Sequence, residues 1–136
     1  MPRVSAAIDL IYDFVVEHMA SVDEKRYRVE YDDPVVRDVV KLLLVLRWAI
    51  DDFVGLEFID PPGKNRLLVQ AEERLNEVRK LLRETAERIR LISEDAAEAL
   101  TIIAEATREE LKKYRFQLGI HNDVLVRRWK EKNPLG

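Results

Sequence analysis

The sequence predicts an all-α protein, an antiparallel bundle of four long helices plus a short C-terminal helix, with at most a minor two-stranded ribbon. The main observation is that residues 64–118 contain neither Gly nor Pro, so no residue in this long segment strongly disfavours a continuous helix. Apolar residues also recur at helical spacing there and in the two preceding segments. With 136 residues, 47% of them hydrophobic, the chain fits one core, and we treat residues 1–136 as a single helical domain.

Residues 1–32 are predicted to form a helix followed by an extended segment. Ser5 is the expected N-cap of this helix, which has one apolar face and runs to about residue 20. The opposite face carries Asp9, Asp13 and Glu17, and like charges four residues apart repel weakly. These carboxylates are expected either to stay solvated or to contact basic residues elsewhere in the chain.

The extended part is residues 26–31, RYRVEY, whose side chains alternate strictly between two faces. This alternation is typical of a strand, and a single strand requires a partner. The candidate partners are residues 56–59, LEFI, in the same chain, or a sheet edge in a neighbouring subunit.

A buried central helix is predicted within residues 33–58. Asp33 is the expected N-cap and Pro34 occupies the first helical position. The helix runs to Gly55 with apolar residues nearly all round it, a pattern that indicates burial on every side. The side chains expected to contribute most to the core are Val36, Val39, Val40, Leu43, Leu44, Leu46, Trp48 and Ile50.

Residues 64–118 are predicted to form a long helical hairpin. Apolar or small residues alternate at spacings of three and four along a heptad seam, as in coiled coils, formed by Leu68, Ala71, Leu75, Val78, Leu82, Thr85, Ile89 and Ile92. Ser93 is the expected cap of a second, antiparallel helix, and an unbroken rod is the alternative. Because these helices are longer than the first two, part of the seam is expected to meet another subunit. The candidate interface residues are Leu68, Leu75, Val78, Leu82 and Ile89.

The C-terminal segment combines a helix stop with a basic helix. Gly119 is the expected left-handed residue at the end of the hairpin, and Asn122 or Asp123 is the expected cap of a short helix over residues 122–132. Basic and aromatic side chains of this helix and of the strand can hold phosphates and stack on bases. The candidate nucleic-acid-binding residues are Arg26, Tyr27, Arg28, Arg127, Arg128, Trp129, Lys130 and Lys132. The alternative is that Trp129 covers the end of the bundle while the charges stay in water.

Composition excludes several kinds of chemistry. The chain has no Cys, which removes disulfides, thiolate nucleophiles and sulfur-ligated metals. No E-x-x-H or H-x-x-x-H spacing and no glycine-rich phosphate loop is present, so we expect neither a metal nor a cofactor. His18 lies on the apolar side of the first predicted helix and is expected to be a core residue. Many Arg and few Asn or Gln residues are typical of proteins from hot environments.

The charge pattern and hydropathy favour a cytoplasmic protein, or one within an intracellular assembly or virion. No uncharged run approaches the length of a membrane span, and acidic residues interrupt the first twenty positions, unlike a signal peptide. Residues 1–60 carry 7 Lys/Arg against 13 Asp/Glu, whereas residues 61–136 carry 16 against 13. An acidic half and a basic half suit packing within a subunit or contacts between subunits at least as well as a nucleic-acid partner.

One motif suggests an enzyme. In KKYRFQLGIHND, Arg115 and His121 have the spacing R-x5-H, which resembles the R-x4–6-H motif of the HEPN superfamily of small helical bundles. Many members of that superfamily cleave RNA without a metal at a dimer interface. The resemblance implies that His121 acts in proton transfer and that Arg115 stabilises phosphate charge.

Taken alone, the residues favour a non-enzymatic function. We expect a self-assembling or complex-forming helical structural protein, such as a capsid or nucleoprotein subunit or a scaffold, which contacts nucleic acid through its basic C-terminal segment. On this hypothesis no residue is catalytic. The alternative is a metal-independent HEPN-like ribonuclease that uses Arg115 and His121.

Overall fold

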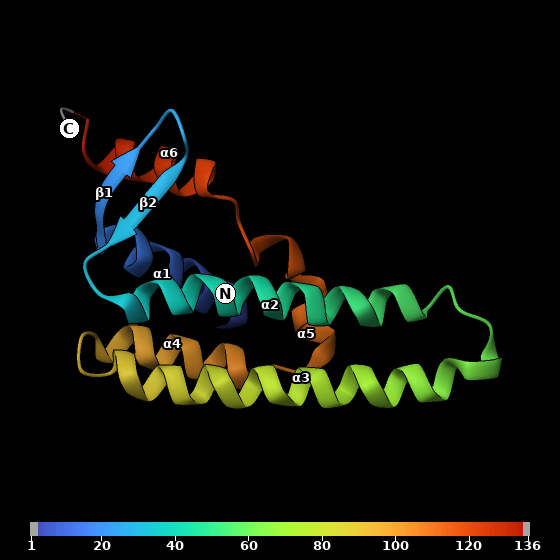
Figure 1. Ribbon diagram of the computed structural model, residues 1–136. Helices are drawn as coiled ribbons and strands as arrows, with labels where there is room; N and C mark the ends of the chain where they lie inside the picture. The colour runs from blue at the N-terminus through green and yellow to red at the C-terminus, as the bar shows by residue number, and fades with distance from the viewer. Residues whose placement is uncertain (1–2, 135–136) are drawn as a thin grey trace.

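The computed structural model describes residues 3–134, and between these residues six α-helices accompany one small antiparallel sheet (Figure 1). The bundle helices are α1 (Arg3–Glu17), α2 (Pro34–Leu56), α3 (Pro61–Ile89) and α4 (Glu94–Glu105). The remaining elements are β1 (Met19–Asp23), β2 (Arg28–Tyr31), α5 (Arg108–Lys113), the 3₁₀ turn η1 (Arg115–Gln117) and α6 (Asn122–Lys132). The predicted fold class is confirmed.

The two longest helices, α2 and α3, extend beyond the others. They lie side by side, α3 also packs on α4, and α4 packs on α1. The regular part of α3 begins after Gly63, whose φ of 88° interrupts the helix, so α3 is about 40 Å long while α4, with 12 residues, is about 18 Å. In Figure 1 the far ends of α2 and α3 therefore project to the right, past α1 and α4.

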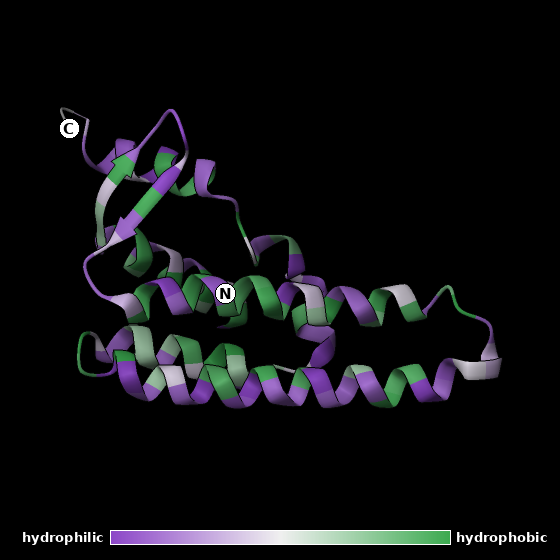
Figure 2. Cartoon of the chain, viewed as in Figure 1, coloured by the Kyte–Doolittle hydropathy of each residue, from purple (hydrophilic) through white to green (hydrophobic). Residues whose placement is uncertain are grey.

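The core lies between the apolar faces of the bundle helices. Removal of these faces from water stabilises the fold. Along α3 the buried side chains are Ala71, Leu75, Val78, Leu82, Thr85, Ala86 and Ile89, which includes most of the predicted seam. The seam thus faces the chain's own α2 and α4. Figure 2 shows the resulting pattern, with α3 mainly hydrophilic and crossed by separate hydrophobic bands.

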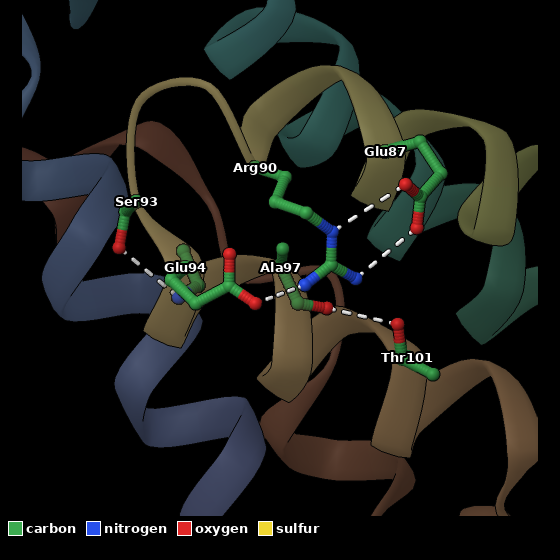
Figure 3. A network of polar contacts seen from close by, with 7 residues as sticks. Glu87, Arg90, Ser93, Glu94, Ala97 and Thr101 are labelled. Atoms are coloured by element: carbon green, nitrogen blue, oxygen red, sulfur yellow. Dashed lines mark hydrogen bonds and ion pairs between the residues drawn. The ribbon is translucent and has the colours of Figure 1, made fainter.

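Helix caps lie where the sequence placed them in two cases. The Asp33 carboxylate accepts a hydrogen bond from the Val35 N–H at 2.9 Å and begins α2. The Ser93 hydroxyl accepts one from the Ala96 N–H at 3.1 Å and begins α4, so the segment is a hairpin and not a rod. Figure 3 shows how Arg90, at the end of α3, binds Glu87 on one side and Glu94 on the other.

The second half of the predicted hairpin is not one helix, which corrects the expectation of continuous helix to residue 118. The chain turns at Ala106, and Thr107 starts α5 with a capping box in which its hydroxyl and the Glu110 carboxylate satisfy each other's backbone N–H groups. Arg79 of α3 donates to the carbonyls of Ala104 and Ala106 at 2.6 and 2.7 Å. These bonds replace the helical partners that the last carbonyls of α4 lack.

The ribbon partner was predicted wrongly. β2 pairs with β1, not with residues 56–59, because α1 ends at Glu17 and leaves residues 19–23 free to extend. The Asp23 carboxylate accepts hydrogen bonds from the N–H groups of Lys25 and Arg26 and forms the connecting turn. A short local turn has a lower entropic cost of closure than pairing with a distant segment.

Three further expectations also fail in detail. Ser5 does not cap α1; it lies within the helix, and its hydroxyl bonds the Gln117 side chain at 3.1 Å. Trp48 is 58% exposed, so α2 is not buried on every side. The N-cap of α6 is His121, not Asn122 or Asp123, and its side chain makes no capping bond.

Candidate interaction surfaces

Contacts with neighbouring parts of the chain shape the segment from Arg115 to His121. The Arg115 guanidinium donates to the Lys112 carbonyl at 3.0 Å and lies 4.4 Å from the Phe116 ring centroid. His121 is exposed at the start of α6. Among residues 3–134 no hydrogen bond joins the two side chains. Gly119 between them has φ of 63°, and a Cβ there would lie 3.0 Å from Leu44 Cδ1, so the segment is shaped by its packing on α2.

The two basic segments predicted to bind nucleic acid lie next to each other. The Asn122 side-chain amide donates to the Tyr27 carbonyl at 2.9 Å, which ties the tip of the β1–β2 hairpin to α6 (Figure 1). We call this region the hairpin–α6 surface, formed by residues 23–28 and 122–132. The structure therefore brings together residues that are about 100 positions apart in sequence.

Two of the basic residues on the hairpin–α6 surface form ion pairs within the chain. The Lys130 ammonium lies 2.7 Å from Glu24, and the Lys132 ammonium lies 3.7 and 3.9 Å from Asp13 and Glu17. The last two carboxylates belong to the acidic face of α1, which thus contacts one basic residue, Lys132. Surface pairs of this kind contribute about 0–1 kcal/mol each, but they lower the net charge that a phosphate would meet.

The other members of the predicted nucleic-acid set divide into two groups. The Arg128 guanidinium lies 5.6 Å from the Tyr12 ring centroid, and Trp129 is half-buried against the core. Three guanidinium groups remain exposed, with no ion pair to any described residue, namely those of Arg26, Arg28 and Arg127. Tyr27, 54% exposed between two of them, has the only positive φ outside glycine among residues 3–134.

A different surface lies on the outer side of α2 and α3. The Arg88 guanidinium lies 3.1 Å from the Asp38 carboxylate, and Arg74 pairs with Asp52. Fourteen positions separate the two acids on α2, and fourteen separate the two arginines on α3 in the opposite direction. Because the helices are antiparallel, the midpoints of both intervals, Val45 and Leu81, lie at one level between the two ion pairs.

The same seven-residue step continues towards the projecting end. Beyond Asp52 and Arg74 it reaches Ile59, in the turn after α2, and Leu67 on α3, which line one cleft of about 320 Å³ together with Leu56. Apolar levels and ion-pair levels therefore alternate along α3, and along α2 and the turn that follows it. We call this surface the heptad face, which consists of Asp38, Val45, Asp52 and Ile59 with Leu67, Arg74, Leu81 and Arg88.

The heptad face is open to solvent. Its four apolar side chains are between 37% and 45% exposed, and the carboxylates and guanidinium groups of its ion pairs are between 38% and 56% exposed. Trp48, three positions after Val45, extends the apolar surface along one rim. Phe58, next to Ile59 in the turn after α2, is 84% exposed.

The residues predicted to form an oligomer interface do not belong to the heptad face. Leu75, Val78, Leu82 and Ile89 are at most 5% exposed and Leu68 is half-buried, so these side chains serve the core of the chain itself. The exposed row of α3 is displaced by one residue, because each of its members immediately precedes a core residue at positions 68, 75, 82 or 89. Sequence analysis missed this row because half of it is arginine and its two leucines, Leu67 and Leu81, are fourteen positions apart.

Burial shifts the pKa of groups in or near the core. Burial raises the pKa of Tyr12, although the Ile120 N–H donates to its hydroxyl at 3.4 Å. Burial also lowers the pKa of the Arg79 guanidinium. His18 is not a core residue as expected: its Nδ1 lies 3.2 Å from the Asp32 carboxylate beyond the end of α1.

Residues 3–134 form neither a cluster of metal ligands nor a membrane-spanning helix. No three acidic or histidine side chains gather there as metal ligands. None of the helices between these residues is both long and apolar enough to cross a membrane. The chain matches no protein-family model, no curated protein and no solved structure.

Proposed function

We propose that the protein is a non-enzymatic, complex-forming helical structural protein and that the heptad face is its docking surface. The observation that carries the proposal is the regular alternation of exposed apolar and ion-pair levels on two adjacent helices. Seven-residue periodicity on a helix surface is the pattern that packs against further helices. Exposed apolar side chains that lie together and are bordered by charged ones are typical of interaction sites.

Natural complexes provide the test. In extracts of cells that make the protein at its normal level, size exclusion should place the wild-type chain well above its own mass of 15.9 kDa. Leu81→Glu should shift the chain to the monomer position, because a charge at this level cannot be buried without a partner. The matched control is Leu91→Glu, since Leu91 is 93% exposed in the turn after α3. A wild-type chain that elutes as a free monomer from fresh extract would contradict the proposal.

A second candidate function is binding of single-stranded nucleic acid by the hairpin–α6 surface. It is supported by the exposed ring of Tyr27 between Arg26 and Arg28, with Arg127 on the adjacent helix. Stacking on one ring with a few phosphate contacts predicts weak affinity that falls as salt rises. Titration of labelled single-stranded DNA and RNA at two salt concentrations tests this function. This function would be excluded if the double variant Arg26→Ala/Tyr27→Ala bound as tightly as the wild type, or if the wild type did not bind at low salt.

A further inference from the structure

We infer that the heptad face docks on the heptad face of a second copy of the chain, so that two α2–α3 pairs form an antiparallel four-helix bundle. The two-fold axis lies parallel to the helices and places α2 of each copy over α3 of the other. This inference rests on the proposed function and names its partner. Charge complementarity and the available contact area support it.

Every level of the heptad face matches itself under this symmetry. Val45 lies over Leu81 of the second copy, and Ile59 lies over Leu67 of the second copy, so apolar levels meet apolar levels. At the charged levels Asp and Arg belong to different helices. The symmetry therefore places each carboxylate against a guanidinium of the second copy and builds a ring of alternating charge.

Other arrangements of two copies are less favourable. If the axis lay in the interface and perpendicular to the helices, α2 would lie on α2 and α3 on α3. Wherever charged levels then met, Asp would face Asp and Arg would face Arg of the second copy. A shift by one level would place apolar side chains on ion pairs and bury charges without new partners, which costs free energy. Only the parallel axis satisfies all four levels together.

The rims of the face supply an independent match. Along the rim of the heptad face, α2 carries Lys41, four positions before Val45, and α3 carries Glu84, three positions after Leu81. Both side chains are exposed, and neither forms an ion pair with any residue between 3 and 134. Stacking α2 over α3 of the second copy brings Lys41 to the same level and edge as Glu84 of the second copy. Rim pairs of this kind determine partner choice and orientation in helical bundles.

The area agrees with a specific but modest interface. From Asp38 to Ile59 the face is about 32 Å long, and two helices spaced 8–10 Å apart give it a width of roughly 20 Å. The contact is then about 600 Å² per copy, near the lower limit for stable protein interfaces. A reversible dimer that forms with rising concentration is the expected behaviour.

A charge-exchange experiment on the purified chain tests the inference. Light scattering and sedimentation over a wide concentration range should show a shift from 15.9 kDa to twice that mass. Lys41→Glu and Glu84→Lys should each weaken dimerisation about tenfold, because each change creates two repulsive rim contacts per dimer. Mixing the two variants should restore dimers, since both rim contacts are attractive in the mixed pair.

The outcomes separate the inference from the proposed function. Leu81→Glu should abolish dimers while Leu91→Glu leaves them unchanged, and circular dichroism should show equal helix content in both variants. A purified wild-type chain that stays monomeric at high concentration overturns the second-copy inference. If the extract experiment still shows a large complex sensitive to Leu81→Glu, the docking surface survives with a different partner. Dimers that the mixed variants fail to restore overturn the arrangement with the parallel axis.

Discussion

Replacement of Gly119 by alanine tests whether the packing of the Arg115–His121 segment on α2 dictates its sequence. Gly119 has φ of 63°, where an alanine costs about 1–2 kcal/mol relative to glycine. The added Cβ would also lie 3.0 Å from Leu44 Cδ1 and 3.3 Å from Leu44 Cα. The side-chain atom can move, but the backbone atom belongs to the central helix and cannot move freely, so overpacking adds to the cost.

The change in the free energy of unfolding also includes an effect on the unfolded state. Alanine restricts the unfolded chain more than glycine does and returns about 0.4–1 kcal/mol. We therefore expect Gly119→Ala to lower the free energy of unfolding by about 1–3 kcal/mol, or roughly 3–5 °C in Tm for each kcal/mol.

Gly55→Ala is the matched control. Gly55 lies within α2, and nothing lies within 4 Å of a Cβ built there, so this variant should gain up to about 1 kcal/mol. Both variants are measured by urea and thermal unfolding, at concentrations low enough to keep the chain monomeric. Equal stability of Gly119→Ala and the wild type would refute the argument that packing on α2 requires glycine here.

Two further predictions concern local features of the fold. Thr107→Ala should lower the free energy of unfolding by about 0.5–2 kcal/mol, because it removes the capping box of α5, whereas Thr107→Ser should retain most of the stability; urea titration distinguishes them. The raised pKa of Tyr12 means that the native state keeps a proton which the unfolded chain loses above about pH 10, so stability should decline as pH rises from there. Tyr12→Phe should decline less between about pH 9 and pH 11 than the wild type does, and an unchanged slope would contradict the role of burial.

Local interactions explain which elements could be predicted from the sequence. Asp33 and Ser93 cap α2 and α4 through bonds to N–H groups two and three residues away, and Gly119 adopts positive φ. Such interactions depend on neighbouring residues only, so residue order reveals them. The all-α class and the break at Ser93 follow from them. The end of α1 was misplaced because apolar residues suit a strand such as β1 as well as another helical turn.

Long-range packing decided the features that the sequence left open. The turn at Thr107 has its own capping signal, but the interruption of the helix there also depends on Arg79, whose bonds to the end of α4 span 25 and 27 positions. The neighbourhood of the hairpin tip and α6 is likewise set by contacts that no local pattern records.

The candidate docking surface shows the same division most clearly. The heptad periodicity of α3 is a property of its sequence, and it identified the helix as one that packs against others. Two adjacent rows of that helix have the same seven-residue period. One consists of Leu68, Leu75, Leu82 and Ile89, and the other alternates leucine with arginine at positions 67, 74, 81 and 88. Only the position of α2 and α4 decides which row is buried, because each row becomes core or surface according to the helix placed against it.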